Sequence, residues 1–418
     1  MSIKLSVNNF FRISNRRDFV TKYLFLFSSS CFLNILLNAF FNFKLSIFYP
    51  NDQFADLLKV ADALNIVDCW KGLSIYHTIG INFLPPFSIF LYSLFSLSYK
   101  YLSLNLAPNQ FYLVLIFISL LFFVLFFINT LKIRQYNLFF LISYPFLFSL
   151  ERGNFSFLVF FLLLFSIYYR KNSTLSIFLL SLAISIKLTP IIFFIVLIHK
   201  NSINQIFKKT TKLFLFLFLI NLVSIYSISY LLDQYAYNFL NFFSEQKFYE
   251  NLMIRNLGGL NYSNSIYMPI YALTKIRNYQ LLDSLFSISP YIISIILFIL
   301  CTILLKHIFK NDIFKLINSY NFKLEFISLS FILFTPVSAD YYLLILLIPI
   351  ILNNFNYINS KRKILYLILF TPKIFLIKGV TISTIINPII ILILLYFLFK
   401  QYSNKSINST IDENSFNT

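Results

Sequence analysis

Two aspartates, Asp52 and Asp56, follow the first long apolar run of the 418-residue chain. Their spacing of four residues places both carboxylates on one face of a short helix. A partly desolvated carboxylate at a membrane surface can act as a general base on a hydroxyl, which makes both residues catalytic candidates. The pair could also hold a hard divalent cation such as Mg²⁺ or Mn²⁺. The alternative is that both are solvated loop charges without a role.

A polar sequence, Glu151-Arg152-Gly153-Asn154, separates two apolar runs. An acid, a guanidinium and an amide side by side are costly to bury unless they are paired, so they predict a polar cavity or the membrane interface. Arg152 suits bidentate binding of phosphate oxygens, and Asn154 suits capping of the next helix. An Arg–Glu pair that only fixes a short turn is the alternative interpretation.

Lys187 lies in a long, largely apolar sequence that is interrupted only by Thr189-Pro190. A buried ammonium needs an anionic partner, and in a membrane enzyme that partner could be a lipid phosphate. The alternative is that Lys187 extends toward a nearby interface, which the Thr-Pro turn would permit.

Asp340, followed by Tyr341, is another lone acid between two apolar runs. It could orient a substrate hydroxyl, pair with Lys187, or serve as a helix N-cap without further function. Arg255, in a later polar segment, is a further candidate for phosphate binding. The three histidines are too far apart in the sequence to predict a metal site.

The composition indicates where these residues must function. The chain is 59% hydrophobic and 12% charged, whereas a soluble domain has about 25% charged residues. Its apolar runs are about 15 to 25 residues long, which suits a hydrocarbon layer of about 30 Å. A water-soluble globule is therefore excluded, and a polytopic membrane protein is predicted. Three cysteines exclude a disulfide framework, and six glycines argue against a glycine-rich nucleotide cradle.

The basic residues predict the topology. Lys and Arg number 34 against 15 Asp and Glu, a formal net charge of +19. They lie in short clusters between apolar runs, as cytoplasmic loops and contacts with anionic lipids require, so no nucleic-acid partner is implied. This orientation places the acidic segment, the Glu151-Arg152 turn and Asp340 on the external face. The basic clusters are Lys132/Arg134, Arg170/Lys171, 200–212, 306–323, 361–363 and Lys400/Lys405.

The expected fold is an all-α bundle of about 11–13 transmembrane helices. We predict a cytoplasmic N-terminus at 1–22, a transmembrane domain at 23–402 and a disordered cytoplasmic tail at 403–418. Two larger external loops are expected at 46–82 and 233–287. Segment 173–199 is predicted to enter from the cytoplasm, turn near Lys187 and return. The expected spans are 23–45, 83–99, 108–131, 136–150, 153–169, the 173–199 hairpin, 213–232, 288–305, 324–335, 341–354, 364–377 and 380–399. With both 83–99 and 108–131 crossing, Lys132 and Arg134 would lie outside, so either one of the two segments does not cross or a re-entrant element lies between them.

Three motifs, Tyr144-Pro145-Phe146 to Asn154, Ile186-Lys187-Leu188-Thr189-Pro190 and Thr335 to Tyr342, resemble glycosyltransferase family 87 in order and spacing. That family is similar in architecture to the wider GT-C class. The resemblance implies a GT-C-like bundle in the plasma (inner) membrane that transfers a hexose, mannose or a related sugar, from a polyprenyl-phosphate donor. The acceptor would be a hydroxyl of a glycan or glycolipid on the external, periplasmic face.

The resemblance implies the place of the catalytic acid, and the other roles are our hypothesis from the residue types. In the GT-C class the catalytic acid lies in the first external loop, where Asp52 and Asp56 stand here. Lys187 and Arg152, with Arg255, would bind the donor phosphate, while Glu151, Asn154, Asp340 and Tyr341 would position the substrates. The rival functions are a transporter or flippase of lipid-linked saccharides and a scaffold subunit whose charges merely pair. Convergence of the acids and bases on one membrane face favours the enzyme.

Overall fold

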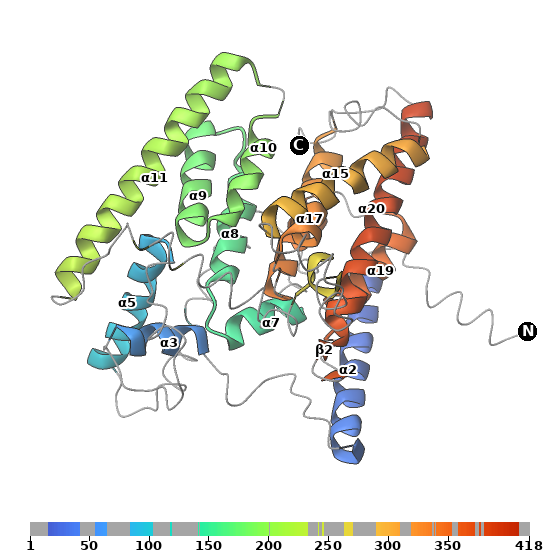
Figure 1. Ribbon diagram of the computed structural model, residues 1–418, viewed down its shortest axis with the longest axis horizontal. Helices are drawn as coiled ribbons and strands as arrows, with labels where there is room; N and C mark the ends of the chain where they lie inside the picture. Colours follow the sequence, from blue (N-terminus) through green and yellow to red (C-terminus); the bar gives the residue numbers. More distant parts are fainter. Residues whose placement is uncertain are drawn as a thin grey trace, which may run out of the picture.

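The computed structural model describes residues 16–41, 55–64, 84–102, 118, 141, 143–199, 201–232, 241, 245, 263–270, 290–309, 319–336, 338, 340–352, 358–372, 376–377 and 380–408. Helices dominate this part of the chain (Figure 1). They are α2 (Arg16–Phe41), α3 (Ala55–Ala63), α5 (Pro86–Leu102), α7 (Tyr144–Glu151), α8 (Ser156–Tyr168), α9 (Ser173–Ile186), η3 (Thr189–Phe193), α10 (Phe194–Leu197), α11 (Ile203–Leu231), α15 (Pro290–Phe309), α17 (Tyr320–Phe334), η6 (Asp340–Leu346), α18 (Leu347–Leu352), α19 (Ser360–Phe370) and α20 (Ile382–Asn408).

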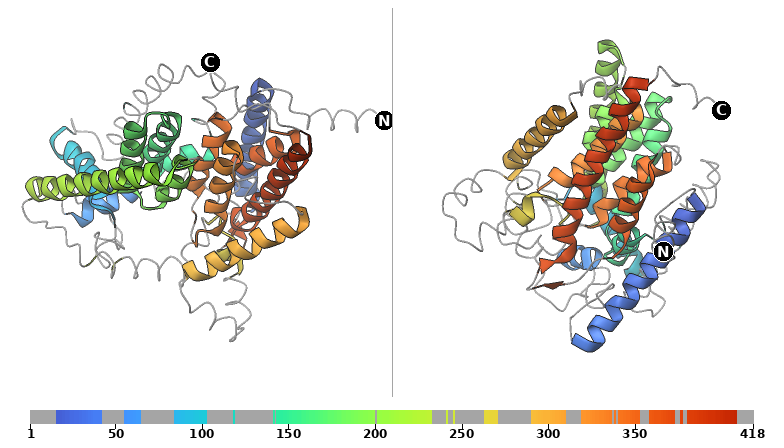
Figure 2. Two further views of the ribbon diagram at one scale, coloured as in Figure 1. Left: turned by 90° about the horizontal axis from the view of Figure 1, so that it is seen from above. Right: turned by 90° about the vertical axis from the view of Figure 1, so that its right-hand side faces the viewer.

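The helices form two groups that lie side by side (Figures 1 and 2). In the first, α9 packs between α8 and α11, and α5 contacts both α11 and the short α3. In the second, α20 contacts α15, α17 and α19, and α19 also contacts α2. Short helices join the groups, because η6 packs against α7, α8 and α17. The two groups are thus held together where the short, broken helices lie.

Three helices among the described residues are long and apolar enough to cross a membrane: 203–231, 290–309 and 383–403. The first two are mostly exposed, as a surface covered by lipid would be. Helices α8 and α9 are apolar but shorter than a full crossing. The helical character of the fold is therefore confirmed among the described residues, and three helices suited to a membrane fit the prediction of a membrane protein, while the number of spans remains a prediction.

One expected span, 364–377, is wrong. Helix α19 ends at Phe370 and is followed by Thr371 and Pro372, and a proline cannot donate the next helical hydrogen bond. Beyond it, β1 (Leu376–Ile377) pairs with β2 (Val380–Thr381) in an antiparallel ladder. The fold is consequently not purely helical, because these two short strands lie among the described helices.

The turn and return predicted for segment 173–199 are present, while entry from the cytoplasm stays a prediction. Helix α9 runs away from the basic Arg170-Lys171 turn and ends at Ile186, and η3 and α10 lead the chain back. At the near end, Arg170 lies 3.8 Å from the centre of the Tyr320 ring, and the His199 ring lies 6.1 Å from the same ring. Both ends of the hairpin therefore meet the start of α17.

Basic residues of three clusters, Arg170, Lys361 and Lys400, lie at this same end of the described helices. The Arg170-Lys171 turn contacts the first residue of α17. The Phe322 ring, in the first turn of α17, lies 5.2 Å from that of Phe399, near Lys400 of α20. Because α19 begins and α20 finishes here, Lys361 and Lys400 lie at this end as well. The arrangement is the one that the basic clusters of the sequence predict for the cytoplasmic side.

Several predictions concern residues outside the described part of the chain. They include Asp52, the remainder of the external segments 46–82 and 233–287 apart from 55–64, 241, 245 and 263–270, and the span at 108–131 apart from residue 118. Two differences in length lie inside it: α2 already begins at Arg16, and α20 continues to Asn408.

Candidate functional site

The site is built on the turn between α7 and α8. Arg152 is the C-cap of α7, and Gly153 follows with a φ of 63°. The Gly153 amide donates to the Leu150 carbonyl and the Asn154 amide to the Ser149 carbonyl, both at 3.0 Å. This pair of bonds is a Schellman motif, whose left-handed position favours glycine because it has no Cβ. The turn directs the side chains of Arg152 and Asn154 to one place.

Asp56 meets both of these side chains. Its Oδ1 accepts from Arg152 Nη2 at 3.0 Å, and its Oδ2 accepts from Asn154 Nδ2 at 2.7 Å. The Asp56 backbone amide also donates to the Arg152 carbonyl at 3.0 Å. The side chains of Arg152 and Asp56 are 17% and 15% exposed. Helix α3 is therefore fixed to the α7–α8 turn by both backbone and side chain, and Asp56 is not a solvated loop charge.

The Asn154 side chain extends the network to α8 and to Lys187. Its Oδ1 accepts from the Ser156 backbone amide at 3.0 Å and from the Ser156 hydroxyl at 2.7 Å. It also accepts from Lys187 Nζ at 2.8 Å, and Lys187 Nζ donates to Ser156 Oγ at 2.6 Å. The predicted N-cap role of Asn154 is wrong in its position, because Phe155 is the N-cap of α8, and Asn154, one residue earlier, accepts from the first amide of the helix. The Asn154 side-chain amide connects an aspartate on one side to a lysine on the other.

Lys187 reaches this place because α9 ends there. Its backbone is extended, with φ of −142° and ψ of 134°, and its amide makes the last helical bond, to Ala183. Lys187 Nζ lies 5.0 Å from the centre of the Tyr342 ring, a distance at which a cation is attracted to an aromatic face. The third motif of the sequence therefore contacts the first two.

The surroundings of Asp56 favour its ionised form. Burial alone would raise the pKa of this carboxyl, but Arg152, Asn154 and Lys59 outweigh it and lower the pKa below its usual 3.8. Both carboxylate oxygens already accept hydrogen bonds from a guanidinium and an amide, so this carboxylate does not fit a divalent cation. No group of three potential metal ligands occurs among the described residues.

The remaining candidates are only partly placed. Glu151 is the last residue of α7 and is half-buried. The backbone of Asp340 and Tyr341 begins η6, next to Tyr342, but their side chains lie outside the described part, as do Asp52 and Arg255. Arg152 bonds to Asp56, a pairing that the sequence alternatives did not include.

Sequence reasoning also missed Ser156 and Tyr342. Serine is common at the start of a helix, so its presence there does not indicate a functional site. The position of Ser156 two residues after Asn154 was the one signal in the sequence that their side chains could meet. A further buried polar cluster fixes the turn before Asp340: Asn264 Nδ2 donates to the Ser338 carbonyl at 2.9 Å, and Asn387 Nδ2 donates to Asn264 Oδ1 at 2.5 Å. Asparagine is frequent in this chain, so Asn264 and Asn387 could not be singled out from the sequence.

Comparison with known proteins gives one match. Residues 83–276 match the model of glycosyltransferase family 87, a range that contains Arg152, Asn154, Ser156 and Lys187. Neither the curated proteins nor the solved structures that were compared with the chain give a match. The family model confirms, over residues 83–276, the resemblance to glycosyltransferase family 87, and this family indicates a membrane protein that is a glycosyltransferase.

Proposed function

We propose that the protein transfers a hexose from a polyprenyl-phosphate donor to a hydroxyl of a glycan or glycolipid on the external face of the membrane. The observation that carries this proposal is the continuous network of Asp56, Arg152, Asn154 and Lys187, which brings together one acid and two cations from three distant segments. Such a set suits a reaction in which a phosphate leaves while a hydroxyl is deprotonated.

Lys187 is the proposed partner of the donor phosphate. Asn154 Oδ1 and Ser156 Oγ are neutral acceptors, so these two bonds position the ammonium without cancelling its charge. The phosphate leaving group gains negative charge as its bond to the sugar breaks, and a cation already in place stabilises that charge. Arg152 pairs with Asp56 through Nη2. Its guanidinium is planar and has further N–H groups, which would donate hydrogen bonds to the phosphate.

Asp52 is the preferred general base, and Asp56 is the positioning residue. A carboxyl whose pKa is lowered is a weaker proton acceptor, and both oxygens of Asp56 already accept hydrogen bonds. Asp52 lies four residues earlier in the same acidic segment of the sequence, outside the described residues. In the reaction, the acceptor oxygen bonds to the anomeric carbon, the carbon–oxygen bond to phosphate breaks, and the hydroxyl proton passes to Asp52. The expected outcome is inversion at the anomeric carbon.

Sugar transfer by the purified protein tests the proposal. With a polyprenyl-phosphate mannose donor in proteoliposomes, Asp52→Ala should lower kcat about 100-fold to 10,000-fold. Asp56→Asn should lower it about tenfold to 100-fold, through the loss of the charge that fixes Arg152. Asp62→Asn, the same change on the same helix, is the matched control and should retain activity.

Three results would contradict the proposal. Full turnover in both Asp52→Ala and Asp56→Asn would exclude carboxylate catalysis in this loop. Movement of an intact labelled lipid-linked sugar across sealed vesicles, without transfer to any acceptor, would identify a flippase instead. Absence of both sugar transfer and lipid movement, with donor binding equal in the parent and in the two variants, would identify a scaffold.

A further inference from the structure

The buried polar cluster before Asp340 is formed by segment 263–270, which is yellow in Figure 1. This segment belongs to the stretch predicted as an external loop, yet the two serines and the asparagine at 263–265 are fully buried. They bond to the end of α17, to the turn at Ser338 and to Asn387 of α20. Burying polar groups in an apolar bundle is costly unless they are hydrogen-bonded, so these bonds determine how the three elements fit together.

The segment caps the end of α17. That helix ends at Phe334, and the carbonyls of the last turn of a helix have no partner within it. Here the Ile266 amide donates to the Leu333 carbonyl at 2.9 Å, and the Ser265 hydroxyl donates to the same carbonyl at 3.2 Å. The end of α17 is thus fixed by a segment that lies 68 residues earlier in the chain.

Asn264 holds the turn that follows α17. Its backbone amide donates to the Ser338 carbonyl at 2.6 Å, and its side-chain Nδ2 donates to the same oxygen at 2.9 Å. Ser263 Oγ accepts from the Ser338 amide at 3.3 Å. Asn387 Nδ2 donates to Asn264 Oδ1 at 2.5 Å, which fixes the orientation of the Asn264 side chain. Both backbone polar groups of Ser338 are therefore bonded to this segment.

Stability alone does not explain this cluster. Asn387 Oδ1 and Ser338 Oγ are buried and have no hydrogen-bond partner among the described residues. Buried polar atoms without partners lower the free energy of unfolding, so a purely stabilising role would favour apolar side chains here. Directional hydrogen bonds instead hold the Ser338 turn in one position.

The Ser338 turn leads directly into the candidate transfer site. Helix η6 begins two residues later, at Asp340, and packs against α7 and α8. The Tyr342 ring, four residues after Ser338, lies 5.0 Å from Lys187 Nζ. Because so short a stretch follows a fixed carbonyl, the position of Ser338 determines where the Tyr342 ring lies.

We propose that Asn264 is a positioning residue of the transfer site: its bond to Ser338 holds η6 so that the Tyr342 ring lies against Lys187. Without that bond the ring moves away, and the ammonium loses its position for the leaving phosphate. The effect on turnover rests on the proposed function, but the placement of Lys187 can be measured without sugar transfer.

Sugar transfer in a double-mutant cycle tests the coupling. Asn264→Ala removes the side-chain bond and keeps the backbone bond to Ser338. It should lower kcat/KM for a polyprenyl-phosphate mannose donor roughly tenfold. In a Tyr342→Leu background the same change should lower it less than about twofold, because the ring that Asn264 positions is gone. Ser263→Ala removes the longer bond to Ser338 and should lower kcat/KM roughly threefold.

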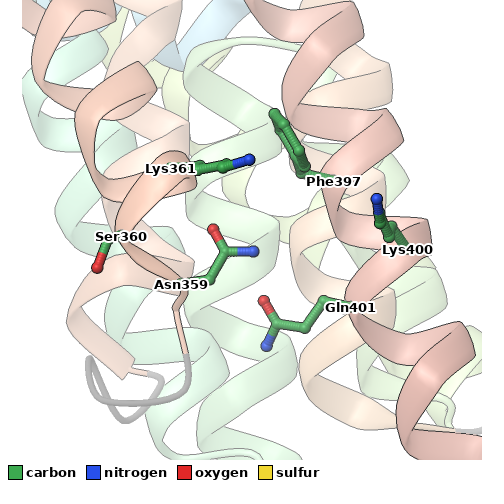
Figure 3. Close-up of a pocket in the computed structure, with 6 residues that line it drawn as sticks. All are labelled: Asn359, Ser360, Lys361, Phe397, Lys400 and Gln401. Atoms are coloured by element: carbon green, nitrogen blue, oxygen red, sulfur yellow. The ribbon is translucent and has the colours of Figure 1, made fainter.

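Asn359→Ala is the matched control. Asn359 is the N-cap of α19, where its Oδ1 accepts from the Arg362 amide at 2.9 Å (Figure 3). Arg362 pairs with Glu325 near the start of α17, so this asparagine lies at the opposite end of that helix from Leu333. The change also removes an asparagine bond to a backbone group, and it should lower the unfolding temperature while kcat and KM stay unchanged.

Trace labelling with a membrane-permeant amine reagent, read by mass spectrometry, measures the placement of Lys187 directly. In Asn264→Ala, labelling of Lys187 should rise roughly threefold because the Tyr342 ring no longer lies against the ammonium. Labelling of Lys323, which is buried at the start of α17, should not change. Equal rises at both lysines would overturn the proposal, because general loosening of the fold would then explain them.

Failure of this inference is distinct from failure of the proposed function. A parent protein without sugar transfer would contradict the function, and the labelling of Lys187 would still decide whether Asn264 places Tyr342. Unchanged labelling of Lys187 in Asn264→Ala would overturn the positioning role. So would sugar transfer by the parent with no loss of kcat/KM in Asn264→Ala, or with an equal loss in both backgrounds.

Discussion

Two charged networks lie in different surroundings. The Asp56–Arg152–Asn154–Lys187 network joins three distant segments, and its ion pair keeps 15% and 17% of its side chains exposed. The Glu325–Arg362 pair lies in the second group of helices, where the two side chains are 4% and 1% exposed. Tyr366 donates to Glu325 Oε1 at 2.5 Å, and Gln401 accepts from Arg362. The first network is accessible and the second is closed.

The difference teaches how to distinguish a functional charge from a structural one. A buried ion pair cannot contact a ligand, and each charge only offsets the desolvation cost of the other. Removing one partner therefore leaves an uncompensated buried charge. A partly open network can exchange its partners for a substrate, and its value lies in positioning charge. Each of the following changes tests that distinction, in order of expected effect.

Arg362→Met should be the most damaging to stability. It leaves Glu325 buried without its cation, at a cost of about 3–5 kcal/mol in the free energy of unfolding. Thermal unfolding in detergent measures the loss. The double variant Glu325→Leu with Arg362→Met should recover most of it, and Lys208→Met, at an exposed position, serves as control. A single variant as stable as the parent would show that the pair contributes nothing.

Lys187→Met should chiefly damage activity. Loss of the cation at the leaving phosphate should lower kcat/KM about 100-fold, or about 2.7 kcal/mol, while unfolding changes by less than about 1 kcal/mol. Lys212→Met is the matched control, since Lys212 Nζ donates to Thr174 at the other end of α9. A loss of stability as large as that of Arg362→Met would place Lys187 with the structural charges.

Gly153→Ala should lower stability by about 1–2 kcal/mol, because a Cβ is unfavourable at its positive φ. It should also lower activity, since Arg152 and Asn154 are positioned by this turn. Gly153→Asn is the informative comparison: asparagine tolerates the left-handed region and should lose less than alanine on both measurements. Equal losses in the two variants would show that backbone conformation is not the cause.

The smallest expected effect is the pH dependence of the Asp56 pair. Because the pKa of Asp56 is lowered in the folded protein, its stabilisation is complete above the unfolded value of 3.8 and is lost as the pH falls through the lower folded value. The difference in unfolding temperature between the parent and Asp56→Asn should therefore be constant from pH 5 to 8 and shrink below about pH 3.8. A difference that grows toward low pH would contradict the ion pair.

The site residues that could be predicted from the sequence are the polar residues that stand alone in apolar segments. Arg152, Asn154 and Lys187 stand out because burying such groups is costly, and basic clusters predicted the end at which Arg170 and Lys361 lie. The partners were not predictable, since a pairing such as Asp56 with Arg152 depends on how α3 packs. Arg362 was counted with the cytoplasmic charges, although it lies buried against Glu325, the lone acid of α17.

The length of α8 bears on how deep in the bilayer Ser156 and Lys187 lie. With 13 residues it is about 20 Å long, whereas the hydrocarbon layer is about 30 Å thick. If the Arg170-Lys171 turn lies at one surface of the bilayer, Ser156 and Lys187 lie about 10 Å beneath the other. A lipid phosphate would then leave the headgroup plane to reach them, and an acceptor would have to be narrow enough to follow it inward.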